Sequence, residues 1–129
     1  MTRYLWICFG SAVGGGIRYL VSGWTQRALG PSFPYGTLAV NLVGSFLLSA
    51  FMYSSIEATW ISPTLRLALT TGVLGGFTTY STFNYETTRY LHDGAWWLAG
   101  ANVTITVLGC LVASFLGWIA ARWLFGARI

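Results

Sequence analysis

Four long stretches of the chain are dominated by hydrophobic residues, and short polar segments containing glycine or proline separate them. A helix needs about 20 apolar residues to cross the hydrocarbon core of a bilayer. We therefore predict an all-α membrane protein whose single domain, residues 1–129, contains four transmembrane helices. The predicted spans are residues 4–24, 36–55, 64–90 and 95–123.

The composition supports this prediction. The chain of 129 residues is 55% hydrophobic and 8% charged, whereas a soluble domain is about 25% charged. A signal peptide is an alternative for the first stretch, because Arg3 precedes an apolar run. The apolar character continues as far as Val21, however, and this length favours a membrane span.

The third stretch contains a segment that is a poor helix former. Gly75-Gly76 is followed closely by the β-branched pair Thr78-Thr79. We predict that this helix is broken near the middle of the membrane. A break frees backbone carbonyls and amides, which is tolerated only where protein or a water-filled cavity surrounds them. The hydroxyl-rich segment from Thr70 to Phe83 is therefore a candidate ion or substrate site.

Small polar residues recur every four positions in the second and fourth stretches, which places each set on one helical face. The sets are Thr37, Asn41, Ser45 and Ser49, and Thr106, Cys110 and Ser114. Packing between membrane helices also uses small polar residues, and this alternative stays open for both sets. Helix packing alone does not account for Asn41, because its amide must find hydrogen-bond partners within the hydrocarbon region. We expect Asn41 to face a polar cavity.

Two ionisable residues have two interpretations each. Arg18 lies inside the first span, where it either faces protein or water or extends to the membrane interface. Glu86 either opens onto a wet vestibule or lies at a solvated helix end, paired with Arg89 or Arg66. The sequence leaves both questions open.

Several classes of function are excluded by the residues present. His92 is the only histidine, and Cys8 and Cys110 lie in apolar surroundings, so we expect neither a metal-ligand cluster nor a disulfide. Nothing resembles a catalytic triad or a phosphate-binding loop, so an enzyme is not expected. The arginines are scattered, and nucleic acid is not an expected partner.

The distribution of arginine bears on membrane topology. Four spans place both chain ends on one side of the membrane. That side carries Arg3, Arg66, Arg122 and Arg128, and the other side carries Arg27 and Arg89. Positive charge sets orientation, and four against two is a weak bias. The chain is therefore expected to insert both ways round and to form an antiparallel dimer.

Four motifs together resemble those of the small bacterial fluoride channels, the Fluc/CrcB type. Residues 14–19 resemble the first-helix motif GGxxR-aromatic, and residues 36–44 resemble the second-helix motif GTLxVNxxG. Residues 75–83 resemble the third-helix motif GGxTTFSTF, and residues 108–117 resemble a fourth-helix Gly-Ser pattern. The resemblance covers essentially the whole chain. The third motif in combination with the second is highly specific.

The resemblance implies a dual-topology, antiparallel homodimer in the bacterial inner membrane. It implies two pores through which fluoride leaves the cytoplasm passively. It also implies a central, structural sodium ion held by backbone carbonyls of Gly75 and Thr78 from both subunits. Hard cations take oxygen ligands, and unwound backbone in a membrane supplies them.

The resemblance further assigns residues to the path of the anion. The pore residues are Asn41, Tyr80, Phe83, Ser81, Thr82, Thr37, Ser114 and Cys110, and the vestibule residues are Arg18 and Glu86. The family pattern has two phenylalanines that present electropositive ring edges to fluoride. Phe83 matches the second, whereas Tyr80 replaces the first and adds a hydroxyl donor. Cys110 replaces the usual serine, and a thiol is a weaker donor.

Two other functions suit a small four-span protein. A small multidrug-type, proton-coupled exporter needs a carboxylate within the membrane, but Glu57, Glu86 and Asp93 all lie near predicted helix ends. A non-transporting membrane scaffold would explain the glycines and the packing stripes. It would not explain a hydroxyl-rich break with paired aromatic residues. The sequence favours the channel.

Overall fold

The computed structural model describes residues 1–57 and 61–126, and this part of the chain is almost entirely helical. The helices are α1 (Thr2–Leu29), α2 (Tyr35–Glu57), α3 (Pro63–Leu67), the π-helix η1 (Ala68–Leu74), α4 (Gly75–Phe77), α5 (Tyr80–His92) and α6 (Trp96–Phe125). No strand occurs in the described residues, which confirms the all-α prediction. The observed ends differ from the predicted ones by one to five residues.

Local sequence explains several of the helix ends. α1 ends before Gly30, whose φ of 86° lies in a region that glycine adopts without steric cost. Pro63 opens α3, and the side chain of Ser62 caps that helix by accepting a hydrogen bond from Leu65 N. Gly94, with a φ of 73°, lies in the turn between α5 and α6.

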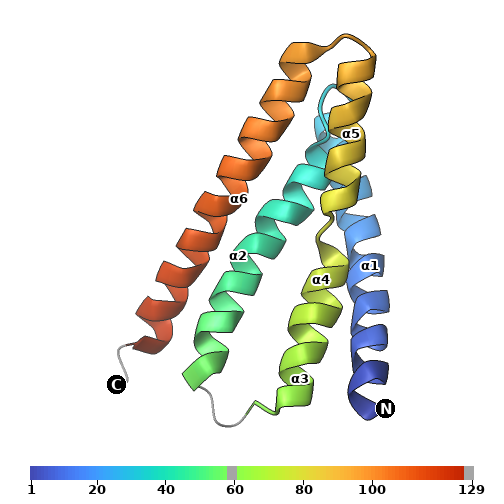
Figure 1. Ribbon diagram of the computed structural model, residues 1–129. Coiled ribbons are helices and arrows are strands. Elements are labelled where there is room, and N and C mark those ends of the chain that lie inside the picture. Colours follow the sequence, from blue (N-terminus) through green and yellow to red (C-terminus); the bar gives the residue numbers. More distant parts are fainter. Residues whose placement is uncertain (58–60, 127–129) are drawn as a thin grey trace.

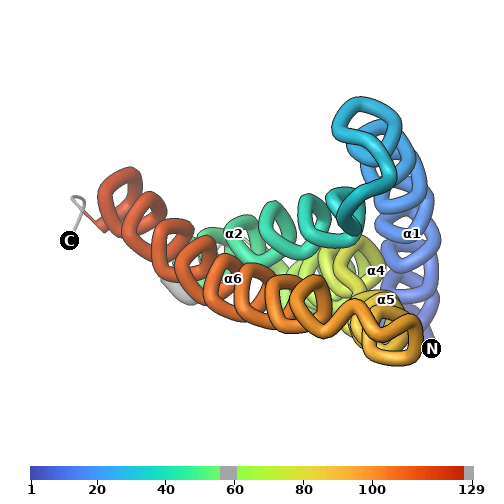
Figure 2. The backbone as a smooth tube through the Cα atoms, turned by 90° about the horizontal axis from the view of Figure 1, so that it is seen from above, coloured from blue at the N-terminus to red at the C-terminus, as the bar shows by residue number. Residues whose placement is uncertain are grey.

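Successive long helical segments run in opposite directions, and α1 begins at the same end of the molecule at which α6 ends (Figure 1). Seen from above, α1 and α6 lie on opposite sides, with α2 and the α4–α5 segment between them (Figure 2). α6 packs on α2 and on α5, whereas α1 packs on η1, α4 and α2. The molecule is therefore an open arrangement of helices with one face of α6 uncovered.

Among the described residues, three helices are long and apolar enough to cross a membrane, namely α1, α2 over Tyr35–Ser55, and α6. The third predicted span is not a single helix, because residues 63–92 form α3, η1, α4 and α5 in succession. The π-helix was not predicted. Its i→i+5 pattern, seen where Gly75 N–H donates to Thr70 O, has no compositional signature that separates it from an α-helix.

Glycines let α1 approach η1 and α4 closely. A Cβ atom on Gly10 would lie 2.5 Å from Ala68 O, and one on Gly76 would lie 2.6 Å from Ser11 O. No real side chain makes such contacts, so these positions require glycine. Close packing of small residues is a main source of association between membrane helices. The packing places the end of α4 against α1, and the candidate site begins there.

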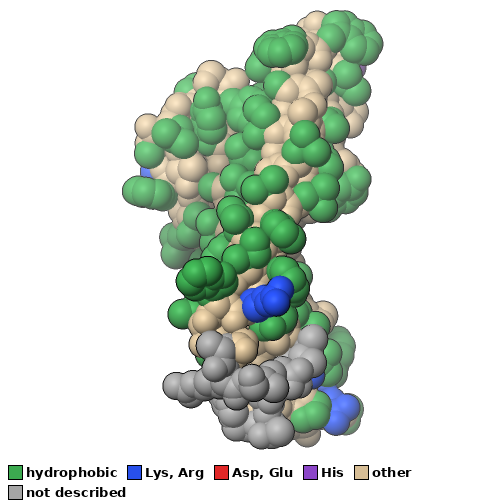
Figure 3. Space-filling view, turned by 90° about the vertical axis from the view of Figure 1, so that its left-hand side faces the viewer, with side chains coloured by type: hydrophobic (Ala, Val, Ile, Leu, Met, Phe, Trp, Pro, Cys, Tyr) green, Lys and Arg blue, Asp and Glu red, His purple; other side chains and the backbone are tan. Residues whose placement is uncertain are grey.

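Hydrophobic side chains extend over the face that α6 presents to its surroundings, with few charged groups among them (Figure 3). On α6, Leu108, Leu111 and Phe115 are 57%, 63% and 60% exposed. A soluble protein rarely exposes a contiguous apolar surface of this extent, whereas lipid solvates it. The molecule is a multi-pass membrane protein.

Candidate functional site

The helical chain is interrupted at two residues between α4 and α5. Thr78 (φ −82°, ψ 158°) and Thr79 (φ −150°, ψ 109°) are both extended. The preceding glycines, Gly75 and Gly76, belong to α4 and are helical, so the break comes after the glycine pair. Thr79 also caps the new helix, because its Oγ1 accepts a hydrogen bond from Thr82 N at 3.2 Å.

Asn41 of α2 satisfies the backbone of the interruption. Its Nδ2 donates to Thr79 O at 3.0 Å, and its Oδ1 accepts from Thr79 N at 2.8 Å. Both residues are 8% exposed, so water does not take over these bonds. The amide of Asn41 is thus hydrogen-bonded to the backbone of Thr79, and the expectation that Asn41 faces a polar cavity stays a prediction. One N–H of that amide remains for another acceptor.

Two carbonyls lose their regular helical partners at this point. In an α-helix the N–H of residue i donates to the carbonyl of residue i−4. Thr79 N–H, which would close a turn onto Gly75 O, donates to Asn41 instead. Thr82 N–H, which would pair with Thr78 O, donates to the Thr79 side chain. The interruption therefore diverts the regular donors of both carbonyls predicted to face a cation.

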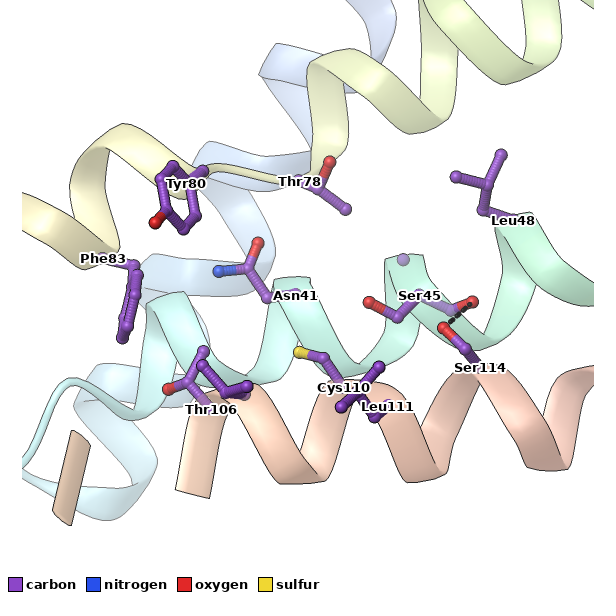
Figure 4. A pocket seen from close by; sticks show the side chains of 12 residues that line it. Asn41, Ser45, Leu48, Thr78, Tyr80, Phe83, Thr106, Cys110, Leu111 and Ser114 are labelled. Atoms are coloured by element: carbon purple, nitrogen blue, oxygen red, sulfur yellow. Dashed lines mark hydrogen bonds between the residues drawn. The ribbon is translucent and has the colours of Figure 1, made fainter. Parts of the chain in front are cut away.

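A groove of about 440 Å³ lies beside the interruption, and side chains of α2, α5 and α6 converge on it (Figure 4). Its lining residues are Asn41, Gly44, Ser45, Leu48, Thr78, Tyr80, Phe83, Thr106, Val107, Cys110, Leu111 and Ser114. The ring centroids of Tyr80 and Phe83 are 5.7 Å apart, with their planes at 43°. Phe83 is 5% exposed and Tyr80 is 73% exposed, so the groove is open on the side of Tyr80.

The groove contains two polar residues to which the resemblance assigned no role, Thr106 and Ser45. Thr106 lines it one helical turn from Cys110, and Ser45 lines it one turn from Asn41. Ser114 Oγ donates to Ser45 O at 3.4 Å across the α2–α6 contact. The four-residue spacing in the sequence had indicated Ser45 and Thr106 as members of a polar helical face. Spacing alone did not show whether such a face lines a groove or packs against another helix.

A second cavity of about 650 Å³ lies on the other side of the interruption, against α1. Its polar lining residues include Arg18, Ser22, Gln26, Thr37, Thr79, Thr82 and Glu86. Thr37 Oγ1 donates to Glu86 Oε1 at 2.7 Å, and Glu86 Oε2 is buried without a partner among the described residues. Thr37 and Thr82, predicted pore residues, thus lie with the predicted vestibule residues. Ser81 is exposed and lines neither cavity.

The contacts of Arg18 and Glu86 bear on the two interpretations of each residue. Arg18 Nη1 donates to Thr78 O at 3.4 Å, so the guanidinium reaches the interruption between α4 and α5. Arg66 donates to Ser55 O at the other end of the molecule. Within the described residues Glu86 forms an ion pair with neither Arg66 nor Arg89. Glu86 faces a cavity, as the vestibule interpretation requires.

The described residues contain no group of three or more His, Cys, Asp or Glu that would hold a metal ion. The described part of the chain combines apolar helices, an interrupted segment and a groove of hydroxyl, amide and aromatic groups. These features define a multi-pass membrane protein with a groove between α2, α5 and α6.

Comparison with known proteins assigns the family. Residues 5–118 match the family described as CrcB-like protein, Camphor Resistance (CrcB). Relatives named "Fluoride-specific ion channel FluC" include the following three. The relative from Anaeromyxobacter sp. (strain K) is 52% identical over 98% of this chain and 100% of its own length. The relative from Sorangium cellulosum is 51% identical over 95% of this chain and 96% of its own length. The relative from Geotalea daltonii is 48% identical over 96% of this chain and 100% of its own length. The chain belongs to this family.

Proposed function

We propose that this protein is a fluoride-selective channel through which fluoride leaves the cytoplasm passively. The observation that carries this function is 52% identity, over 98% of the chain, with a relative named as a fluoride-specific ion channel. The protein is a channel and not an enzyme. Family membership also argues against the exporter and the scaffold, the two other functions that suit the sequence.

The groove has the chemistry that this function requires. Fluoride is small and strongly hydrated, so a selective path must replace its water with hydrogen-bond donors at short range. Asn41 retains one N–H for the anion, and the hydroxyl of Tyr80 supplies another donor. The ring edges of Tyr80 and Phe83 carry positive partial charge. We assign the pore to this groove, with Cys110 and Ser114 as its α6 side.

The second cavity suits a vestibule. Arg18 places a positive charge there, which raises the local concentration of anions. Thr37 and Thr82 extend the row of hydroxyls from this cavity toward the interruption, and exposed Ser81 adds a further hydroxyl. We infer that the anion enters through this vestibule and then passes Asn41 into the groove.

The functional unit that we propose is an antiparallel homodimer in the bacterial inner membrane, with two pores. An open groove supports this assembly, because Tyr80 is 73% exposed beside buried Phe83 and a second copy would cover it. The weak arginine bias supports insertion in both directions. A reporter on the C-terminus should label both sides of the membrane in one population. Labelling of a single side would contradict the antiparallel assembly.

A structural sodium ion at the interruption is the remaining part of the proposal. The residues fit it, because the regular donors of Gly75 O and Thr78 O are diverted elsewhere. Sodium is a hard cation that takes oxygen ligands, and two subunits would supply two such pairs. The ion would neutralise the ends of the carbonyl dipoles. Arg18 also donates to Thr78 O, so guanidinium and ion would share this carbonyl.

Anion efflux from liposomes tests the proposed function. Purified protein is reconstituted with internal potassium fluoride or potassium chloride, and a potassium ionophore then allows net salt efflux. We expect rapid release of fluoride and retention of chloride. Equal release of both anions would contradict a selective channel, and release of neither would contradict a channel.

A further inference from the structure

Three polar side chains connect the groove to the backbone of α5. Thr106, which lines the groove, donates from Oγ1 to Asn102 Oδ1 at 3.3 Å. Asn102 Nδ2 donates to Thr87 Oγ1 at 2.9 Å, and Thr87 Oγ1 donates to Phe83 O at 2.8 Å. Asn102 is 1% exposed and Thr106 is 6% exposed. Neither Asn102 nor Thr87 is among the described residues that line the groove.

The donor and the acceptor of each hydrogen bond in this chain of three follow from the bond between Thr87 and Phe83 O. Phe83 O is a carbonyl and can only accept, so Thr87 must commit its single hydroxyl proton to it. The oxygen of Thr87 can then only accept from Asn102, which turns the amide nitrogen toward Thr87. The amide oxygen of Asn102 is left facing Thr106, and Thr106 must donate its own proton to it.

This direction has a consequence for an anion in the groove. A hydroxyl has one proton, and that of Thr106 is committed to Asn102, so the groove meets the lone pairs of Thr106 Oγ1. Lone pairs repel an anion. To donate to fluoride, Thr106 must rotate and leave Asn102 Oδ1, a fully buried acceptor, without a donor. Direct binding of an anion at Thr106 is therefore weakened by residues that do not touch the anion.

Resting on the proposed function, we infer that Asn102 is a positioning residue that keeps the Thr106 end of the groove a weak site for fluoride. Conduction requires binding that is favourable enough for entry and weak enough for exit. Thr87 sets the orientation of the Asn102 amide, and Asn102 sets the direction of the Thr106 hydroxyl. Thr87 and Asn102 together thus determine how long fluoride remains in the groove beside Phe83.

The primary test is Asn102→Leu, which keeps the side-chain volume similar and frees the Thr106 proton for the groove. Fluoride flux in liposomes is measured at graded fluoride concentrations. We expect the half-saturating concentration to fall about fivefold, the factor that one ordinary hydrogen bond contributes, and the maximal flux to fall with it. A purely structural defect would lower the maximal flux and leave half-saturation unchanged, and this result would overturn the inference.

Thr87→Val keeps the test decisive if Asn102→Leu does not yield folded protein. Without the Thr87 hydroxyl, nothing turns the Asn102 nitrogen away from Thr106, so half-saturation should shift in the same direction by a smaller factor. Thr87→Ser retains the hydroxyl and should match wild type. An unchanged half-saturating concentration in Thr87→Val would contradict the inference.

The final control removes the hydroxyl on which the mechanism acts. In a Thr106→Val background, Asn102→Leu and Thr87→Val should no longer shift half-saturation, because there is no proton to release. An equal shift in that background would overturn the role of Thr106. Failure of the proposed function itself would show as an absence of fluoride-selective flux in wild type, so the two failures are distinguishable.

Discussion

The side-chain amide of Asn41 forms two hydrogen bonds with the backbone of Thr79, one to its carbonyl and one from its N–H. The amide of Asn41 donates to Thr79 O and accepts from Thr79 N, at 3.0 and 2.8 Å. A side chain on α2 thereby replaces the backbone partners that the interruption between α4 and α5 removes. Membrane interiors offer no water to do this. Asn41 is consequently a structural residue of the interruption as well as a lining residue of the groove.

Replacement of Asn41 by Ala should therefore impair folding and flux together. Thr79 would keep a buried N–H and a buried carbonyl without partners, and each such group costs about 1–3 kcal/mol. We expect a lower thermal unfolding temperature in detergent and loss of fluoride flux. Ser49→Ala, on the same face of α2, should leave both unchanged. An Asn41→Ala protein as heat-stable as wild type would contradict the structural role.

Replacement of Phe83 by Ile should abolish fluoride flux without dissociating the assembly. Isoleucine fills most of the space but has no ring edge to present to the anion. Flux is measured in liposomes, and assembly is checked by size-exclusion chromatography. Phe115→Ile, at a 60% exposed position on α6, serves as the control and should conduct normally. Undiminished flux in Phe83→Ile would remove this ring from the pore.

Replacement of Tyr80 by Phe should speed transport. The hydroxyl of Tyr80 adds a donor to the groove, and tight binding slows the exit of an ion. We expect the maximal flux to rise and the half-saturating fluoride concentration to rise with it, by about fivefold for one lost hydrogen bond. Both parameters come from flux measured over a range of fluoride concentrations. Slower flux in Tyr80→Phe would show that the hydroxyl assists conduction.

Replacement of Gly76 by Ala should destabilise the contact between α1 and α4. The added Cβ would lie 2.6 Å from Ser11 O, which is backbone and cannot move aside alone. Overpacking of this kind costs about 1–3 kcal/mol. Gly16→Ala is the matched control, because a Cβ there meets nothing within 4 Å. Thermal unfolding in detergent should separate the two variants, and equal unfolding temperatures would contradict the packing argument.

Much of the fold is predictable from residue pattern, because lipid imposes a simple rule on length and polarity. Residues 4–24, 36–55 and 95–123 fall within α1, α2 and, apart from Ala95, α6. Gly75-Gly76 and Thr78-Thr79 marked the weak point of the third segment. The non-helical residues are the threonines and not the glycines, because a threonine pair that Asn41 and its own hydroxyl can satisfy is stable in extended form.

The candidate site was only partly predictable. Asn41, Tyr80, Phe83, Cys110 and Ser114 do share one groove. Other predicted pore residues, such as Thr37 and Thr82, lie in the second cavity instead. Four-residue spacing identifies one face of a helix, but it does not say which neighbouring helix that face meets.

Hydrophobic length, helix breakers and the family motifs can be read from the linear order of residues, because each depends on near neighbours in the chain. They were enough to predict an all-α membrane protein and its fluoride-channel family. The donor and acceptor directions could not be read in this way. They depend on residues 15 to 60 positions apart, such as Asn102 with Thr87, Asn41 with Thr79, and Arg18 with Thr78. Only helix packing brings these groups within hydrogen-bonding distance, and it therefore decides which groups face the groove.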